Sequence, residues 1–103
     1  MIVRIVKMTF RPEAVPDFGA LFAERKEQIA GFPGCKHLQL LKDLENGSYI
    51  FFTYSHWENE AALDHYRSSD FFKDTWQRTK ALFAQRAEAW SVSQAFLSAD
   101  IYR

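Results

Sequence analysis

Trp57 and His65 are the two side chains whose types and spacing best suit chemistry on an aromatic molecule. A tryptophan at the end of a strand can form one wall of a flat pocket, where it stacks on a ring and donates its indole N–H. A histidine titrates near neutral pH, so His65 is a candidate general base. The structural alternatives are a Trp57 packed on a helix and a His65 on a helix surface beside Asp64.

The other metal-ligating and nucleophilic side chains form no recognisable site. His37 and His56 fall on neighbouring predicted strands, but two histidines without a third ligand are weak evidence for a metal. The single Cys35 cannot form an internal disulfide and is expected to be a small buried residue in a reducing compartment. Neither a nucleophile–base–orienter triad nor a phosphate-binding loop is found. We therefore expect no metal and no cofactor.

Alternating apolar patterns predict four strands that position these residues. The first is Ile2–Phe10 and the last is Trp90–Phe96. Between them, Cys35–Asp43 and Ser48–Trp57 are predicted to pair through a tight hairpin turn at 44–47, where Asn-Gly supplies positive φ angles.

Helical periodicity separates these strands. In the segment Arg11–Gly31, apolar positions and one arginine recur at steps of three and four: Val15, Phe18, Phe22, Arg25 and Ile29. Pro12 or Pro16 suits the first turn, and Gly31 with Pro33-Gly34 ends the helix.

Two further helices are predicted between the third and fourth strands. Asn59 or a neighbour caps a short one that carries His65, and another begins near Ser68 or Ser69. Phe72, Trp76 and Phe83 form one apolar stripe at helical spacing. This stripe is either core or, at Phe72 and Trp76, part of a pocket wall.

The order βαββαβ predicts one α+β domain of ferredoxin-like topology over residues 1–103, with a core at 2–96 and a tail at 97–103. Its four-stranded antiparallel sheet can be covered by helices on one face only. The other face also carries aromatic and β-branched residues, so a second copy is expected to cover it. Either Phe51 or Phe52 then faces the partner, and Ile101-Tyr102 of the tail can reach it.

Composition excludes several classes of function. Lys+Arg and Asp+Glu balance at 13 each, which argues against a nucleic-acid partner. No uncharged stretch approaches the roughly 20 residues that span a bilayer, and charges interrupt the N-terminal apolar segment, so we expect a cytoplasmic protein without a membrane partner. Aromatic residues make up 17% of the chain, more than a core of this size needs. Some of them should face a partner or a ligand.

The chain resembles the antibiotic biosynthesis monooxygenase (ABM) family over about Ile2–Phe96. The resemblance rests on Phe-Pro-Gly-Cys from Phe32 and on the Trp57-x-x-x-x-x-Leu63-x-His65 run. It implies a homodimeric α+β barrel. Several members of the family oxidise quinol-like or polyketide aromatic substrates without metal or flavin, and others degrade haem.

The family's functional residues match this chain in part. Polyketide-oxidising members resemble it at Trp57, but where they carry an Asn four residues earlier this sequence has Thr53. Haem-degrading members carry a strand-one Asn and a helical Trp and His. In this chain the positions of that Trp and His fall near Tyr66 and Trp76, and the first strand contains no Asn. Haem degradation is therefore not expected.

These observations predict a cofactor-independent monooxygenase acting on a small aromatic molecule. His65 is the candidate catalytic residue. The candidate substrate-binding residues are Trp57, Thr53, Phe72 and Trp76. The alternative is a non-catalytic dimeric domain that binds an aromatic metabolite.

Overall fold

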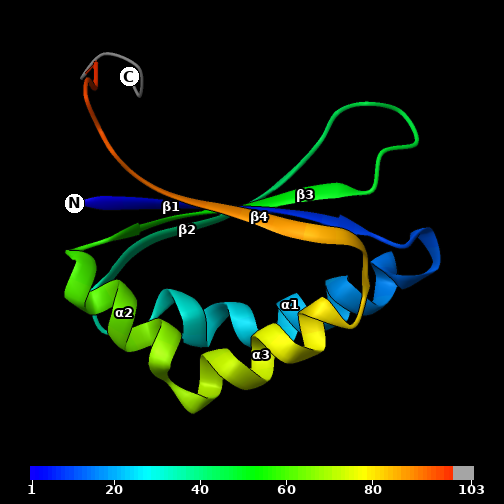
Figure 1. Cartoon of the computed structure of the whole chain (residues 1–103), viewed down its shortest axis with the longest axis horizontal. Coiled ribbons are helices and arrows are strands. Elements are labelled where there is room, and N and C mark those ends of the chain that lie inside the picture. Colours follow the sequence, from blue (N-terminus) through cyan, green and yellow to red (C-terminus); the bar gives the residue numbers. More distant parts are fainter. Residues whose placement is uncertain (99–103) are drawn as a thin grey trace.

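The computed structural model describes residues 1–98 as a four-stranded sheet with helices on one side (Figure 1). The elements in chain order are β1 (Ile2–Phe10), a 3-10 turn η1 (Pro12–Ala14), α1 (Val15–Ala30), β2 (Cys35–Lys42), β3 (Ile50–Trp57), α2 (Glu60–Ser68), α3 (Asp70–Lys80) and β4 (Phe83–Ser93). The predicted α+β class with ferredoxin-like βαββαβ order is confirmed. The tail residues Ile101 and Tyr102 lie outside the described residues.

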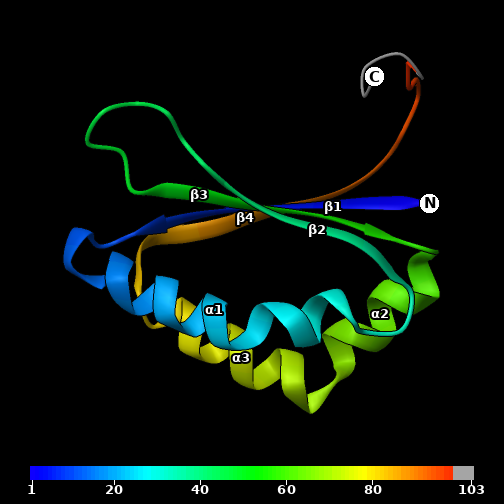
Figure 2. The ribbon, with the colours of Figure 1, turned by 180° about the vertical axis from the view of Figure 1, so that it is seen from behind.

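The sheet is antiparallel throughout, in the order β2-β3-β1-β4. Figures 1 and 2 show α1, α2 and α3 all lying against the same face, and we call this the covered face and the opposite one the open face. The long β2–β3 connection and the segment that follows β4 both rise on the side of the open face (Figure 1).

Local sequence signals define the helix ends as expected. Pro16 lies in the first turn of α1, and Gly31 follows its last residue. The Asn59 side chain accepts a hydrogen bond from the Ala62 amide at 2.8 Å and caps α2. Ser69 likewise caps α3 by accepting from the Phe72 amide at 3.1 Å. Each cap satisfies an amide that the first helical turn leaves without a partner.

Gly34 fixes the start of α2 against the beginning of β2. Its φ of +87° favours glycine, and a Cβ atom at this position would collide with the side chain of Ala62. Its carbonyl also accepts a hydrogen bond from the Glu58 amide at 2.8 Å. This close approach requires glycine.

The prediction for the fourth strand was wrong in its bounds. The strand is Phe83–Ser93 rather than Trp90–Phe96, and Phe83 belongs to it rather than to the helix before it. The seven-residue spacing from Trp76 to Phe83 equals about two helical turns, so the periodicity did not reveal that α3 ends at Lys80. The first half of this edge strand is also rich in alanine and charge, and register shifts against β1 interrupt its alternation.

The hairpin prediction was also wrong in detail. The connection between β2 and β3 spans residues 43–49 instead of the predicted 44–47. Only Gly47 has a positive φ, +80°, and the Ser48 amide donates to the Glu45 carbonyl at 3.0 Å. One glycine in the third position of a four-residue turn thus does what an Asn-Gly pair was expected to do.

The core between helices and sheet consists of two separate clusters. One contains Ile29, Trp57, Leu63 and Tyr66, where α1, β3 and α2 meet. The other contains Met8, Phe10 and Phe18, with Phe51, Phe22 and Phe83 packed against it. In the second cluster, Phe10 stacks on Phe18 with ring centroids 4.2 Å apart. The space between the two clusters holds the candidate site.

Candidate functional site

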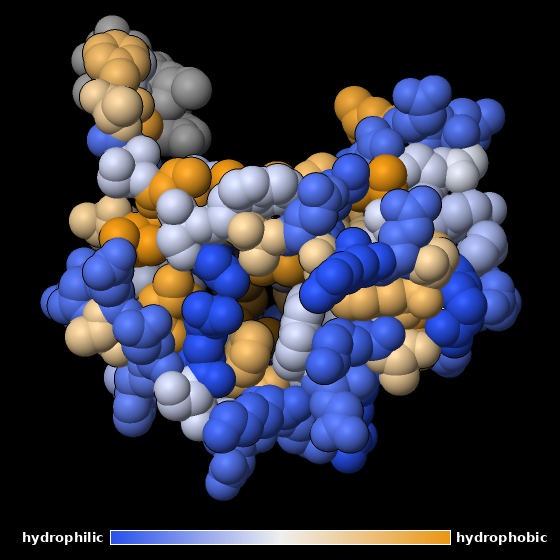
Figure 3. Space-filling view, in the orientation of Figure 1, coloured by the Kyte–Doolittle hydropathy of each residue, from blue (hydrophilic) through white to orange (hydrophobic). Residues whose placement is uncertain are grey.

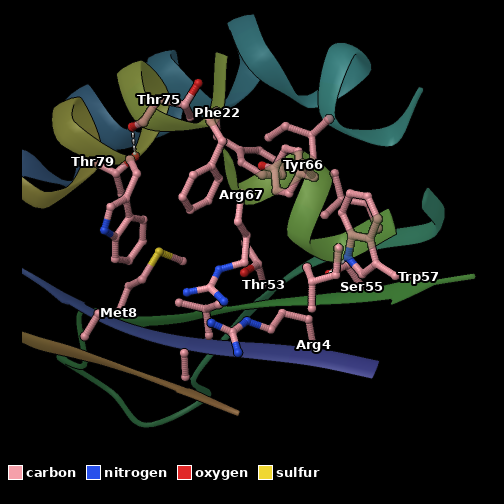
Figure 4. Close-up of a pocket in the computed structure, with 18 of the residues that line it drawn as sticks. Arg4, Met8, Phe22, Thr53, Ser55, Trp57, Tyr66, Arg67, Thr75 and Thr79 are labelled. Atoms are coloured by element: carbon pink, nitrogen blue, oxygen red, sulfur yellow. Dashed lines mark hydrogen bonds between the residues drawn. The ribbon is translucent and has the colours of Figure 1, made fainter. Parts of the chain in front are cut away.

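A cavity of about 390 Å³ lies between the covered face of the sheet and the helices. Figure 3 shows a recess on this side of the molecule, floored by hydrophobic residues and bordered by hydrophilic ones. Aromatic and aliphatic side chains from both core clusters form most of its wall. The polar lining residues are Arg4, Thr53, Ser55, Tyr66, Arg67, Thr75 and Thr79 (Figure 4). A cavity of this size and character suits a small aromatic molecule.

Trp57 lines the cavity and is also a core residue, with only 1% of its surface exposed. Its indole stacks on the Tyr66 ring, with centroids 4.8 Å apart and an angle of 24° between the planes. The indole N–H already donates to the Ser55 hydroxyl at 3.0 Å. Both interpretations of Trp57 therefore hold, because its indole packs on the α2 residue Tyr66 and also lines the cavity. Its N–H is already hydrogen-bonded to Ser55.

The other predicted substrate-binding residues also line this cavity. Thr53 lies two residues before Ser55 on the same face of β3, and its hydroxyl has no hydrogen bond to another residue within 1–98. Phe72 and Trp76 extend from α3 with nearly parallel rings: the ring centroids are 6.1 Å apart and the angle between the ring planes is 9°. The structure thus brings these four predicted residues together in the wall of one cavity.

His65 does not line the cavity. It lies on an exposed part of α2, and its ring contacts Phe32 at a centroid distance of 5.7 Å. The α2 residues that do line the cavity are Leu63, Tyr66 and Arg67. The helical rotation of 100° per residue turns position 65 away from the face shared by 63, 66 and 67. This placement does not support His65 as a base for a molecule held in the cavity.

Sequence reasoning missed Arg4, Arg67 and Tyr66. Arg4 interrupts an otherwise apolar set on β1, Ile2, Val6, Met8 and Phe10, and a charge within such a set was the signal that could have found it. In the structure its guanidinium donates to the Ser91 hydroxyl at 3.0 Å. Arg67 could not be placed without the orientation of α2. Both guanidinium groups reach the same part of the cavity, close to β1 (Figure 4).

Burial shifts the titration of two lining residues. It raises the pKa of Tyr66, which therefore keeps its phenolic proton at neutral pH. Burial, and then the nearby charge of Arg67, lower the pKa of Arg4, but an arginine still carries its charge at neutral pH. Among the described lining residues no Asp, Glu, His, Lys or Cys is present. The cavity offers proton donors and cations and no evident base.

The remaining histidines belong to the open face of the sheet. His37 and His56 are register partners on β2 and β3, with ring centroids 5.1 Å apart. Their neighbour Tyr54 lies 5.1 Å from His56. No group of three or more His, Cys, Asp or Glu residues able to hold a metal ion is found within residues 1–98.

Within residues 1–98, no helix is long and apolar enough to cross a membrane.

Fold and site together define an α+β domain with an aromatic-lined cavity between one antiparallel sheet and its helices. The model of the antibiotic biosynthesis monooxygenase family matches residues 1–78, well over half of the sequence, and the chain belongs to this family. The match covers β1 to α3, including most of the cavity wall, and ends before β4. No curated protein matches the sequence significantly.

Solved structures share the whole fold. A structure described as an antibiotic biosynthesis monooxygenase is 22% identical with a TM-score of 0.83, over 90% of this chain and 97% of the other. A conserved protein from Methanosarcina mazei Go1 is 26% identical with a TM-score of 0.82, over 89% and 91% of the two chains. A variant of SnoaB, a cofactor-independent oxygenase from Streptomyces nogalater, is 16% identical with a TM-score of 0.84, over 96% and 97%.

Proposed function

We propose that this protein is a monooxygenase that oxidises a small quinol-like or polyketide-like aromatic substrate with dioxygen, without metal or flavin. The observation that carries the proposal is the cavity itself, which is of suitable size and lined by Trp57, Tyr66, Phe72 and Trp76. Membership of the family and the likeness to a cofactor-independent oxygenase support it.

The proposed reaction needs no external reductant. A ring CH₂ group of an anthrone-type substrate becomes C=O: one atom of O₂ forms the new carbonyl, and the other leaves as water with the two hydrogens. The substrate supplies all four electrons. The protein's contribution is then to bind the ring, exclude water and stabilise the substrate anion that reacts with O₂.

The lining residues supply these functions without a dedicated base. The stacked rings of Phe72 and Trp76 orient a planar substrate, and the free Thr53 hydroxyl is available to hydrogen-bond to it. Arg4 and Arg67 favour an ionised substrate, because a positive charge lowers the pKa of a nearby acid. The proton passes to water at the cavity opening.

Oxygen uptake with a panel of anthrones and quinols tests this proposal. We expect substrate-dependent uptake by the wild-type protein. Ala89→Phe, which adds a ring where exposed Ala89 lines the cavity on edge strand β4, should abolish uptake while keeping the fold. Ala23→Phe makes the same change at an exposed position on α1 outside the cavity and should leave uptake unchanged. Uptake that is equal in the two variants would place the reaction elsewhere.

A non-catalytic binding domain for an aromatic metabolite is the second candidate. The absence of an acid–base side chain from the described lining, and the position of His65 outside it, favour this candidate. Saturable binding of the same anthrones and quinols with no oxygen uptake would establish it in place of the enzyme.

We also propose that two copies associate through the open face. Exposed hydrophobic side chains gather on this face and on the two segments that rise beside it. They are Leu41, Leu44, Tyr49, Trp90, Val92, Phe96 and Leu97. A biological interface buries roughly 1,000 Å² or more, which a four-stranded sheet can supply. Sedimentation should therefore give twice the 12.1 kDa chain mass.

The free Cys35 is in keeping with a cytoplasmic location, which stays a prediction.

A further inference from the structure

The charged residues that line the cavity are both cations. Arg4 comes from β1 and Arg67 from α2, and no carboxylate is found among the described lining residues. Figure 4 shows the two guanidinium groups close together at the β1 side of the cavity. The two positive charges repel each other, and this repulsion adds to the effect of burial in lowering the pKa of Arg4.

Neither arginine is neutralised by the protein within residues 1–98. The only side-chain hydrogen bond from Arg4 goes to the uncharged Ser91 hydroxyl. By contrast, Arg11, Arg25 and Arg78 each pair with a carboxylate, at 3.0, 2.9 and 3.2 Å respectively. Two like charges held together beside an apolar cavity are costly unless something negative binds between them.

We propose that Arg4 and Arg67 form a binding site for an oxyanion carried by the aromatic ligand, so that the substrate is an aromatic carboxylate or a phenolate. Guanidinium groups are planar and present several donors, which suits the paired oxygens of a carboxylate or a single phenolate oxygen. The rings of Trp57, Tyr66 and Phe72 line the same cavity, so one molecule can place its ring among them and its oxyanion on the arginines. This inference rests on the proposed function for the aromatic nature of the ligand.

Equilibrium binding of three naphthalene probes, followed by tryptophan fluorescence, tests the site. We expect 2-naphthoate to bind about ten- to a hundredfold more tightly than the neutral isostere 2-naphthamide, as charge-assisted hydrogen bonds predict. The third probe, 2-naphthol, reports on phenolate binding: its absorbance should show ionisation at a lower pH in the complex than in water. Either preference supports the site and identifies the source of the oxyanion.

Matched variants assign the preference to the arginines. Arg4→Met and Arg67→Met keep side-chain length and remove the charge, and each should reduce the discrimination between 2-naphthoate and 2-naphthamide by about tenfold. Arg78→Met removes an equal charge from an exposed position on α3 outside the cavity and should leave the discrimination between the two probes unchanged. Since Arg67 is exposed, its variant tests the site even where Arg4→Met fails to fold.

Two results would overturn the inference: equal affinity for 2-naphthoate and 2-naphthamide with no shift in 2-naphthol ionisation, or a preference that both arginine variants retain. The oxygen-uptake assay separates this failure from that of the proposed function. Wild-type protein that oxidises neutral anthrones yet shows no anion preference keeps the function and loses this site. Anion preference without oxygen uptake keeps the site and loses the function.

Discussion

Both faces of the sheet carry aromatic side chains, but the two faces pack them differently. On the covered face, Trp57 is 1% exposed and Phe10 stacks on Phe18, so rings pack on rings. On the open face, Trp90 is 45% exposed, and His37, Tyr54 and His56 form a row of ring contacts. The strand pleat alone separates the two sets.

This difference indicates two functions for one sheet. The covered face encloses a cavity, and two of its polar groups, the Thr53 hydroxyl and the Arg67 guanidinium, have no hydrogen-bond partner within residues 1–98, which is typical of a ligand site. The open face carries exposed hydrophobic side chains, Leu41, Trp90 and Val92, which is typical of association between copies. Substitutions on the two faces should therefore fail in different ways.

The largest expected effect comes from placing the same charge on neighbouring residues of β3. Phe51 packs in the Phe10 cluster, whereas Phe52 pairs with Leu41 on the open face. Phe51→Glu should prevent folding, because it loses about 3–5 kcal/mol of ring packing and places a charge among the rings of the Phe10 cluster. Phe52→Glu should keep the helical circular dichroism and sediment as a monomer. The reverse pattern would contradict the assignment of faces.

Truncating a tryptophan on each face gives the next contrast. Trp57→Ala should lower the free energy of unfolding by about 3–5 kcal/mol and weaken aromatic binding, because the ring belongs to both core and cavity wall. Trp90→Ala should leave ligand binding intact and weaken self-association. Urea unfolding and sedimentation at several concentrations measure both effects. Equal loss of ligand affinity in the two variants would break the comparison.

A smaller effect concerns the hydrogen bond that orients Trp57. Ser55→Ala leaves the buried indole N–H without its acceptor and should cost about 1–3 kcal/mol. Ser91→Ala removes the exposed hydroxyl that accepts from Arg4 and should cost less than about 0.5 kcal/mol. Urea unfolding compares the two. An unchanged stability in Ser55→Ala would mean that the indole N–H finds another acceptor.

The smallest effect is a pH dependence on the open face. Burial, and then the neighbouring His37, lower the pKa of His56 from its ordinary 6.5 in the folded protein, and its buried Nε2 atom has no hydrogen-bond partner within residues 1–98. The unfolded state therefore takes up the proton first, so stability should fall as pH drops below about 6.5 towards the lower pKa of the folded state. Urea unfolding at a series of pH values measures this slope.

Replacing His56 by Gln should flatten that slope, with His65→Gln as the control for loss of an exposed histidine. An unchanged slope in His56→Gln would assign the pH dependence to another group.

Much of the fold could be predicted because its signals are local. Alternation marks β1 and β3, and the caps at Asn59 and Ser69 mark the starts of α2 and α3. The bounds of β4 could not be predicted, because Phe83 fits a helical stripe and a strand equally well. Its ring does contact Trp76, at a centroid distance of 5.7 Å, but from the sheet. Hydrophobic periodicity in the sequence can indicate that two side chains are neighbours, but it does not show whether each lies in a helix or in a strand.

The cavity wall was predictable in part for a similar reason. Trp57, Thr53, Phe72 and Trp76 lie on element faces that point inward, and pattern and family resemblance both indicate them. His65 was chosen for its chemistry and for its place in the run that resembles the family, but the rotation of α2 places it outside the cavity. Arg4 and Arg67 lie more than 60 residues apart in sequence and become neighbours only in the folded chain, where both line the same cavity (Figure 4).

The central claim, that this cavity inserts oxygen into a bound aromatic molecule, is tested most directly by ¹⁸O₂ labelling with a substrate from the anthrone and quinol panel. The account predicts one ¹⁸O atom in the product and one in water for each molecule converted, in the wild-type protein and not in Ala89→Phe. Product without ¹⁸O, or the same labelling in the blocked variant, would contradict it.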